Sequence, residues 1–118
     1  MKILVAEDEP ILLNAITFKL SKEGYEIIKA ENGKEAMDAC EKHFPDMVIT
    51  DMMMPFANGL EVISWVKQLK GKNIPVIILS AMGQENTVLE AFKVGADDYI
   101  TKPFSPNELV VRVKKLLK

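Results

Sequence analysis

Five short apolar runs recur along the chain without strict alternation of polar and apolar residues. They cover residues 3–6, 26–30, 47–50, 76–79 and 99–101, and four of them are rich in Ile, Val or Leu. Runs of this length and composition are typical of strands that are covered on both faces. The pattern therefore predicts five short strands inside the protein.

Between these runs, apolar residues recur at spacings of three and four, which is the period of a helix. The first such stretch contains Ile11, Ala15 and Phe18, and the last contains Leu109, Val113 and Leu116. This spacing predicts amphipathic helices whose apolar stripes face the core. Strands that alternate with helices favour an α/β fold, in which right-handed crossovers build a parallel sheet with helices on both faces.

Turn and cap residues stand at the boundaries of these elements. Asn32-Gly33, Gly71 and Gly95 occupy places where a turn or a left-handed residue is expected. The segment Ser105-Pro106-Asn107-Glu108 predicts a capping box at the start of the last helix, in which the Glu108 side chain reaches back to the N-cap Ser105. No repeat or linker divides the sequence, so we expect one domain over residues 1–118 and no second domain in this chain.

Composition narrows the class of protein. The 118 residues are 48% hydrophobic, which is enough for one core, and the net charge of -2 gives no electrostatic reason to bind nucleic acid. The single cysteine, Cys40, cannot form an internal disulfide, which suits a reducing cytoplasm. The N-terminal apolar stretch is too short for a signal peptide or a membrane span. We expect a soluble, cytoplasmic protein without membrane contact.

Chemically active side chains follow the ends of four predicted strands. Glu7 and Asp8 follow the first strand, Asp51 the third, Ser80 the fourth and Lys102 the fifth. In a doubly wound sheet of order 2-1-3-4-5, strands 1 and 3 flank the point where strand order reverses, and ligands bind there. Because adjacent strands are about 4.8 Å apart, Asp8 can meet Asp51, and the long Lys102 side chain can span about 10 Å. We expect these five side chains to form one site.

Three carboxylates at one site repel one another and need positive charge. Two unit charges about 4 Å apart cost about 4 kcal/mol at an effective dielectric of 20. Lys102 supplies one positive charge, and a hard dication would supply two more, so we predict Mg²⁺ held by few protein groups and several waters. Mg²⁺ and Lys102 would neutralise a phosphoryl group on Asp51, while the Ser80 hydroxyl donates a hydrogen bond to it.

Taken together, these segments resemble the receiver domain of bacterial two-component response regulators over the whole chain. The matching segments are Glu7-Asp8, residues 51–55 (DMMMP), Ser80-Ala81 and residues 95–104 (GADDYITKPF). The resemblance implies a flavodoxin-like or CheY-like (βα)5 fold. It also implies a phosphorylation-activated signalling switch that accepts its phosphoryl group from a sensor histidine kinase. Such a domain is not an enzyme beyond phosphoryl transfer to itself and slow autodephosphorylation.

By that resemblance, Asp51 is the phosphoacceptor, and Ser80 and Lys102 assist the transfer. The resemblance further implies a Mg²⁺ site, which Mn²⁺ can also occupy, formed by Glu7, Asp8, Asp51 and the backbone carbonyl of Met53. In receiver domains, the side chains two residues after the phosphoacceptor and two after the Ser or Thr tune hydrolysis. Here both are methionines, Met53 and Met82, which cannot orient an attacking water, so we expect slow autodephosphorylation.

Ser80 and Tyr99 are implied to be the switch pair. Ser80 would move toward the phosphoryl group and Tyr99 would turn inward behind it, which changes the surface of the fourth helix, fifth strand and fifth helix. Plain core packing is the alternative interpretation of Tyr99. The resemblance also predicts a cis peptide bond between Lys102 and Pro103.

The last third of the chain is most similar to the winged-helix, OmpR/PhoB-type subfamily, which dimerises through the surface of helix 4, strand 5 and helix 5. The implied interface residues are Asp97, Asp98, Glu108, Arg112 and Lys115. Asp98 is expected to pair with Arg112, and Asp97 with its own basic partner Lys115, across a two-fold axis. Val88 stands where a basic partner of Glu108 is expected, which weakens the interface only slightly because exposed ion pairs contribute little singly.

Two partners are implied besides a second copy of the chain. The sensor kinase is expected to dock on the first helix, at Ile11, Leu12, Asn14 and Ala15. A DNA-binding output domain is conceivable beyond Lys118, whereas the domain itself is not expected to bind nucleic acid.

Three alternatives share part of this pattern. A flavodoxin-like cofactor binder would have the same fold, but Glu7-Asp8-Glu9 would repel a bare phosphate. A phosphatase with an aspartyl nucleophile would have a second acid two residues after Asp51, where Met53 stands. An interaction module that is never phosphorylated is the third alternative, and the full set of acids disfavours it. The Gly-x-x-x-x-Gly-Lys loop of nucleotide hydrolases does not occur.

Overall fold

Strands and helices alternate along the whole chain in the computed structural model, which describes residues 1–69 and 73–117. The strands are β1 (Lys2–Ala6), β2 (Glu26–Ala30), β3 (Met47–Asp51), β4 (Val76–Ser80) and β5 (Asp98–Thr101). The helices are α1 (Pro10–Lys22), α2 (Gly33–His43), α3 (Gly59–Gln68), α4 (Glu85–Lys93) and α5 (Pro106–Leu116). Each predicted strand is therefore confirmed to within one residue at its ends. Gly71, where a turn was predicted, and Lys118 lie outside the described residues.

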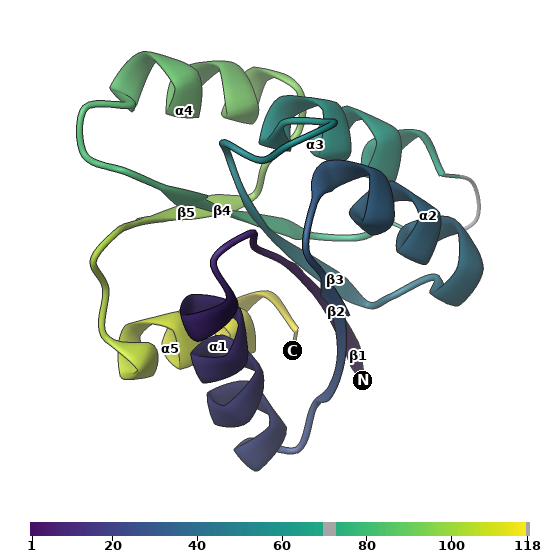
Figure 1. The fold of residues 1–118 in the computed structure, drawn as a ribbon, viewed down its shortest axis with the longest axis vertical. Helices are drawn as coiled ribbons and strands as arrows, with labels where there is room; N and C mark the ends of the chain where they lie inside the picture. Colours follow the sequence, from purple (N-terminus) through teal and green to yellow (C-terminus); the bar gives the residue numbers. More distant parts are fainter. Residues whose placement is uncertain (70–72, 118) are drawn as a thin grey trace.

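The five strands form one parallel sheet in the order β2-β1-β3-β4-β5, as predicted. Helices α1 and α5 cover one face of the sheet, and α2, α3 and α4 cover the other (Figure 1). Strand order reverses between β1 and β3, so the loops after these two strands open onto the same edge of the sheet. None of the helices in the described ranges is long and apolar enough to cross a membrane.

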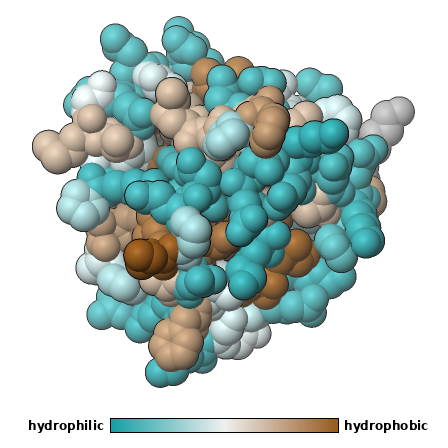
Figure 2. Space-filling view, viewed as in Figure 1, coloured by the Kyte–Doolittle hydropathy of each residue, from teal (hydrophilic) through white to brown (hydrophobic). Residues whose placement is uncertain are grey.

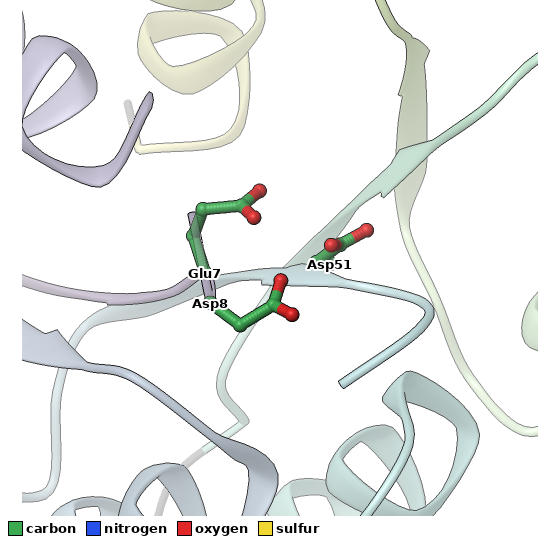
Figure 3. Close-up of side chains that lie close together, drawn as sticks. All are labelled: Glu7, Asp8 and Asp51. Atoms are coloured by element: carbon green, nitrogen blue, oxygen red, sulfur yellow. The ribbon is translucent and has the colours of Figure 1, made fainter. Parts of the chain in front are cut away.

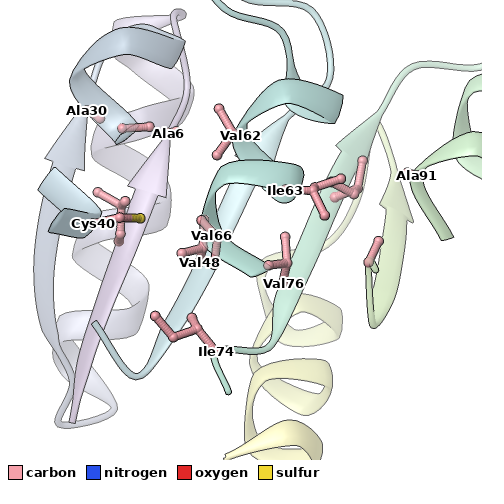
Figure 4. Packing of buried hydrophobic residues seen from close by; sticks show 14 of the residues in the cluster. Ala6, Ala30, Cys40, Val48, Val62, Ile63, Val66, Ile74, Val76 and Ala91 are labelled. Atoms are coloured by element: carbon pink, nitrogen blue, oxygen red, sulfur yellow. The ribbon is translucent and has the colours of Figure 1, made fainter. Parts of the chain in front are cut away.

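Two hydrophobic layers hold the helices to the sheet. Leu4 and Ala6 of β1 join the layer under α2, α3 and α4, whereas Ile3 and Val5 join the layer under α1 and α5. Figure 4 shows the first layer, in which Cys40 of α2 packs beside the strands. Because β1, β3 and β4 are buried on both faces, their residues are mostly apolar without alternation, which explains these continuous runs in the sequence. The edge strands β2 and β5 are more exposed.

Helix α1 presents to solvent the stripe that its spacing predicted to be buried. Ile11, Ala15 and Phe18 are exposed, and hydrophobic areas lie over α1 in the space-filling view (Figure 2). The residues that pack on the sheet are instead Leu13, Ile16 and Leu20. The helix has two apolar stripes with the same spacing, so the period alone could not identify the buried one. For α5 the prediction is confirmed, since Leu109 and Val113 are buried.

Ser105 and Asn32 both cap the N-termini of helices, but each differs from the prediction in one respect. Ser105 accepts a hydrogen bond from the backbone N–H of Glu108 at 3.1 Å, but the Glu108 carboxylate contacts Arg112 instead of reaching back, so only half of the capping box forms. Asn32 is the N-cap of α2 and Gly33 begins that helix, rather than forming a separate turn. A Cβ on Gly33 would lie 1.9 Å from the Ala57 carbonyl oxygen, so this position requires glycine. Gly95, by contrast, has the predicted left-handed conformation, with φ of 120°.

Candidate active site at the carboxyl edge of the sheet

Two acids follow β1 directly, and the turn into α1 places them differently. Glu7 is fully buried, and its Oε2 accepts a hydrogen bond from the backbone N–H of Glu9 at 3.1 Å. The backbone N–H of Glu7 donates to the carbonyl of Ala30, which ties the turn to β2 at 3.0 Å. Asp8 is exposed. The turn therefore fixes one carboxylate inside the protein and leaves the next one open to solvent.

Asp51 is the last residue of β3, with β1 on one side and β4 on the other. Its Oδ1 accepts a hydrogen bond from the backbone N–H of Met52 at 2.8 Å, and its Oδ2 lies 3.2 Å from the Lys102 ammonium. The residue is 8% exposed. Its carboxylate is thus held by two donors and still has access to solvent.

The carboxylates of Glu7, Asp8 and Asp51 converge, as the strand order predicted. Each offers one oxygen, and these oxygens lie within 4.8 Å of one another (Figure 3). The convergence depends on β1 and β3 being neighbours in the sheet, where Ala6 pairs with Thr50. Three hard oxygen donors from two adjacent strand ends are a donor set that fits a small divalent cation such as Mg²⁺.

Lys102 reaches into this pocket from the end of β5. Its Nζ lies 2.9 Å from Glu7 Oε1 and 3.2 Å from Asp51 Oδ2, so the lysine spans the distance that the sequence predicted. Burial alone would lower the pKa of Lys102, but the hydrogen bond to Glu7 and the charge of Asp51 outweigh it and raise the pKa. The side chain is therefore a permanent cation. The peptide bond between Lys102 and Pro103 is cis, as predicted.

One lysine does not balance the acids. Burial raises the pKa of Glu7 to about 7, well above the ordinary value of 4.5; the Lys102 hydrogen bond opposes this rise and the charge of Asp51 adds to it. Burial also raises the pKa of Asp51, against the lowering effect of the Lys102 charge. Both carboxyl groups therefore hold a proton more tightly than free acids do, because the pocket lacks enough positive charge to stabilise their ionised forms, and a dication would supply it.

Ser80 and Tyr99, from the adjacent strands β4 and β5, both line a cavity beside α4. The cavity has a volume of about 450 Å³, and Ser80, Val88, Phe92 and Tyr99 are among the residues that line it. The Ser80 hydroxyl is buried and donates a long hydrogen bond of 3.5 Å to the carbonyl of Ile100. Tyr99 is 41% exposed and packs edge-on against Phe92 with 5.9 Å between ring centroids, so it is not a core residue.

Four of the five charged residues predicted at the dimer interface, Asp97, Asp98, Glu108 and Arg112, already have partners within the chain. Arg112 contacts Asp98 at 2.8 Å and Glu108 at 3.2 Å. Asp97 contacts Lys67 of α3 at 2.9 Å and also accepts a hydrogen bond from the backbone N–H of Val76. Lys67 was not identified from the sequence because it is 30 residues away from Asp97 and on a different element. Only the tertiary structure joins them.

The remaining residues singled out in the sequence lie on the loops after β3 and β4 and on helices α4 and α5. Met53 follows Asp51 with an exposed side chain, and Met82 is exposed at the mouth of the α4–β5 cavity. Val88 is buried against the same cavity instead of reaching toward α5. Lys115 is exposed on α5.

Comparison with known families and proteins gives matches along nearly the entire chain. The family model of the response regulator receiver domain matches residues 3–114. The transcriptional regulatory protein ResD of Bacillus subtilis is 42% identical over 99% of this chain and 48% of its own length. The alkaline phosphatase synthesis transcriptional regulatory protein PhoP of the same organism is 38% identical, over 99% of this chain and 48% of its own length. The chain thus spans about half the length of these relatives.

Solved structures agree with the sequence matches. The receiver domain of the Francisella response regulator 1452 superposes with a TM-score of 0.87 and 37% identity, over 98% of this chain and 94% of that one. A response regulator receiver domain protein from Clostridium thermocellum superposes with a TM-score of 0.91 and 31% identity, over 98% of this chain and 93% of that one. These structures share the strand order and helix layers described above.

Proposed function

Because the chain belongs to the family of response regulator receiver domains, we propose that Asp51 accepts a phosphoryl group from a sensor histidine kinase in a Mg²⁺-dependent reaction. The observation that carries this proposal is the pocket itself. Three carboxylates lie within 4.8 Å of one another, and the Lys102 ammonium lies 3.2 Å from Asp51 Oδ2. Few other chemistries need a nucleophilic carboxylate, further acids and a fixed cation at one point.

In the proposed reaction, an Asp51 carboxylate oxygen attacks phosphorus. The phosphorus–nitrogen bond to the kinase histidine breaks as the new phosphorus–oxygen bond forms. The Met52 N–H holds Oδ1, so the carboxylate is oriented before the reaction begins. Lys102 stabilises the negative charge that the phosphoryl oxygens bring. Glu7, Asp8, Asp51 and the Met53 carbonyl would hold Mg²⁺, or Mn²⁺ in its place, and the bound cation would supply further positive charge for those oxygens.

The protein acts only on itself in this scheme. It takes up one phosphoryl group and loses it by slow hydrolysis, without turnover of an external substrate. A phosphatase would place a second acid two residues after the nucleophile, whereas Met53 stands there with a side chain that has no acid or base function.

Phosphorylation would act on the surface of α4, β5 and α5 through Ser80 and Tyr99. The Ser80 hydroxyl would give up a long, weak hydrogen bond of 3.5 Å when it turns to a phosphoryl oxygen. The cavity of about 450 Å³ beside Tyr99 is large enough for its ring to enter. Inward movement of Tyr99 would end its contact with Phe92 of α4, so the surface of α4, β5 and α5 would change.

The direct test is incubation of the protein with acetyl phosphate, with and without Mg²⁺, followed by intact mass measurement. We expect one added phosphoryl group per chain, only when Mg²⁺ is present, and peptide mapping should locate it at Asp51. Failure to gain mass in Mg²⁺ would contradict the proposal and favour an interaction module that is not phosphorylated.

Mg²⁺ should bind about ten times more tightly at pH 8 than at pH 6. Because the pKa of Glu7 is about 7 in the cation-free pocket, Glu7 carries a proton at pH 6 that the cation must displace, and it has lost that proton at pH 8. Isothermal titration calorimetry at both pH values measures the ratio. Glu7→Gln cannot take up this proton, so its weaker Mg²⁺ binding should vary much less with pH. Equal affinity of the parent protein at both pH values would contradict the prediction.

Dimerisation through α4, β5 and α5 is part of the proposal, and apolar residues should contribute most to it. Arg112 and Asp97 already have partners within the chain, so exchange for partners across a two-fold axis gains little. Leu89 and Val111 are exposed on α4 and α5, and their burial would be new on association.

Phosphorylated protein should therefore dimerise, and Val111→Asp should prevent this while leaving phosphoryl uptake intact. Light scattering of the phosphorylated protein measures the mass of the assembly. Phe18→Asp is the matched control, because Phe18 is equally exposed but lies on α1, outside this surface. A Val111→Asp protein that dimerises as well as the parent would contradict the role of the apolar residues.

The remaining partners are proposed from the family and from the exposed stripe of α1. Ile11 and Ala15 are exposed on α1, next to the acidic pocket in sequence, and would form part of the kinase-docking face. The relatives named above are transcriptional regulatory proteins about twice as long as this chain. A DNA-binding output domain and a cytoplasmic location therefore belong to the proposal, although residues 1–118 themselves would bind no nucleic acid.

A further inference from the structure

Two exposed thioethers stand beside the candidate phosphorylation site. Met53 follows Asp51 by two residues and is 63% exposed. Met82 follows Ser80 by two residues, is 80% exposed, and lines the same cavity as Ser80. The loops after the adjacent strands β3 and β4 therefore each carry an exposed methionine, two residues beyond Asp51 and Ser80 respectively.

Accessibility separates these two residues from other methionines of the chain. Met47 and Met52 are 0% and 1% exposed, so dissolved oxidants reach their sulfur atoms only when the protein opens. Met1 is exposed but precedes β1, at the opposite edge of the sheet from Glu7 and Asp51. Oxidation under native conditions should therefore affect Met53 and Met82 first among the methionines near the pocket.

We propose that Met53 and Met82 form an oxidation site through which peroxides shorten the lifetime of the phosphoryl group on Asp51. The inference rests on the proposed function. In the oxidation step, one peroxide oxygen forms a bond with the methionine sulfur as the oxygen–oxygen bond breaks. The thioether loses two electrons and becomes a sulfoxide, and the peroxide is reduced to water or an alcohol.

Oxidation to the sulfoxide changes how the Met53 and Met82 side chains hydrogen-bond to water. A thioether sulfur is a weak hydrogen-bond acceptor, so the unmodified Met53 and Met82 leave an approaching water without orientation. A sulfoxide oxygen is a strong acceptor on the same flexible side chain, and it can hold a water near the phosphorus atom. That water attacks phosphorus, the bond from phosphorus to Asp51 breaks, and the released phosphate or the solvent takes the water's proton.

The experiment compares phosphoryl lifetimes before and after mild oxidation. Protein treated with dilute hydrogen peroxide is freed of oxidant and checked by peptide mass for sulfoxides at Met53 and Met82. It is then phosphorylated with acetyl phosphate and Mg²⁺, and loss of the phosphoryl group is followed by intact mass. Oxidation should shorten the half-life about fivefold, the factor that one net hydrogen bond to the attacking water provides.

The controls separate these two residues from general damage. A protein with Met53→Leu and Met82→Leu has side chains of similar size that cannot be oxidised, so peroxide should leave its half-life unchanged. Met1→Leu should respond to peroxide as the parent does. Methionine sulfoxide reductase should restore the half-life of the oxidised parent protein.

The outcomes distinguish this inference from the proposed function. An unchanged half-life of the parent after both sulfoxides have formed would overturn the inference alone, and so would an equal response of the double leucine variant. Untreated protein that takes up no phosphoryl group would overturn the proposed function and the inference with it.

Discussion

Asp51→Asn protein should take up no detectable phosphoryl group from acetyl phosphate in Mg²⁺, a loss of at least about a thousandfold in rate. The amide has nearly the shape of the carboxylate, and its oxygen can still accept the hydrogen bond that the Met52 N–H donates to Asp51. It has no negative charge, however, and is a poor nucleophile toward phosphorus. Intact mass measurement over the time in which the parent is fully phosphorylated tests this expectation.

The matched control is Asp38→Asn, which removes an exposed carboxylate from α2, a helix that carries none of the pocket residues. This variant should be phosphorylated like the parent, and all three proteins should show cooperative unfolding. If Asp51→Asn still gains one phosphoryl group, the acceptor is a different side chain, and the assignment of Asp51 is wrong.

Lys102→Met should slow phosphoryl uptake by about a hundredfold or more, because it removes the fixed cation from the phosphoryl site. Methionine keeps much of the length of the lysine side chain without its charge. Lys102 lies 2.9 Å from the fully buried Glu7, so the substitution also leaves a buried carboxylate without its cation. At pH 8 and without Mg²⁺, we expect the free energy of unfolding to fall by about 3 kcal/mol.

The loss of stability in Lys102→Met should depend on pH. Since the pKa of Glu7 in the folded protein, about 7, is above its ordinary value of 4.5, the folded state binds this proton more tightly than the unfolded state does. The contribution of this proton to the free energy of unfolding is largest below pH 4.5 and declines as the pH rises toward 7. Removal of Lys102 removes an effect that lowers the Glu7 pKa, so the decline should continue further above pH 7. Urea unfolding at pH 6 and pH 8 should therefore show the larger loss at pH 8.

Lys114→Met is the control for a lost lysine charge. Lys114 pairs with Glu23 at the surface, where solvent screens the charges, so this variant should keep nearly the parental stability and should be phosphorylated at the parental rate. A Lys102→Met protein that matches Lys114→Met in both measurements would show that Lys102 has no special role in the pocket.

The sequence by itself determined the architecture and the membership of the pocket. The three central strands are buried on both faces, so their side chains are mostly apolar without alternation, and all five runs were visible directly. Chain reversal at each strand end requires a loop, and the carboxyl ends of parallel strands meet at one edge. Acids and a lysine placed after different strands could therefore be assigned to one site before their distances were known.

Only the tertiary structure decided which side chains are buried, which charged groups form ion pairs and how far burial shifts their pKa values. The two apolar stripes of α1 have the same period, and the sheet selects Leu13 and Ile16 over Ile11. Asp97 pairs with Lys67 rather than with a residue on α5, because the packing of α3 brings that ammonium within 2.9 Å. The pKa of Glu7, about 7, likewise arises from burial among neighbours on several strands. Local sequence encodes the period and the chemistry of each element, whereas burial and electrostatic energy depend on distances between elements that are set only when the chain folds.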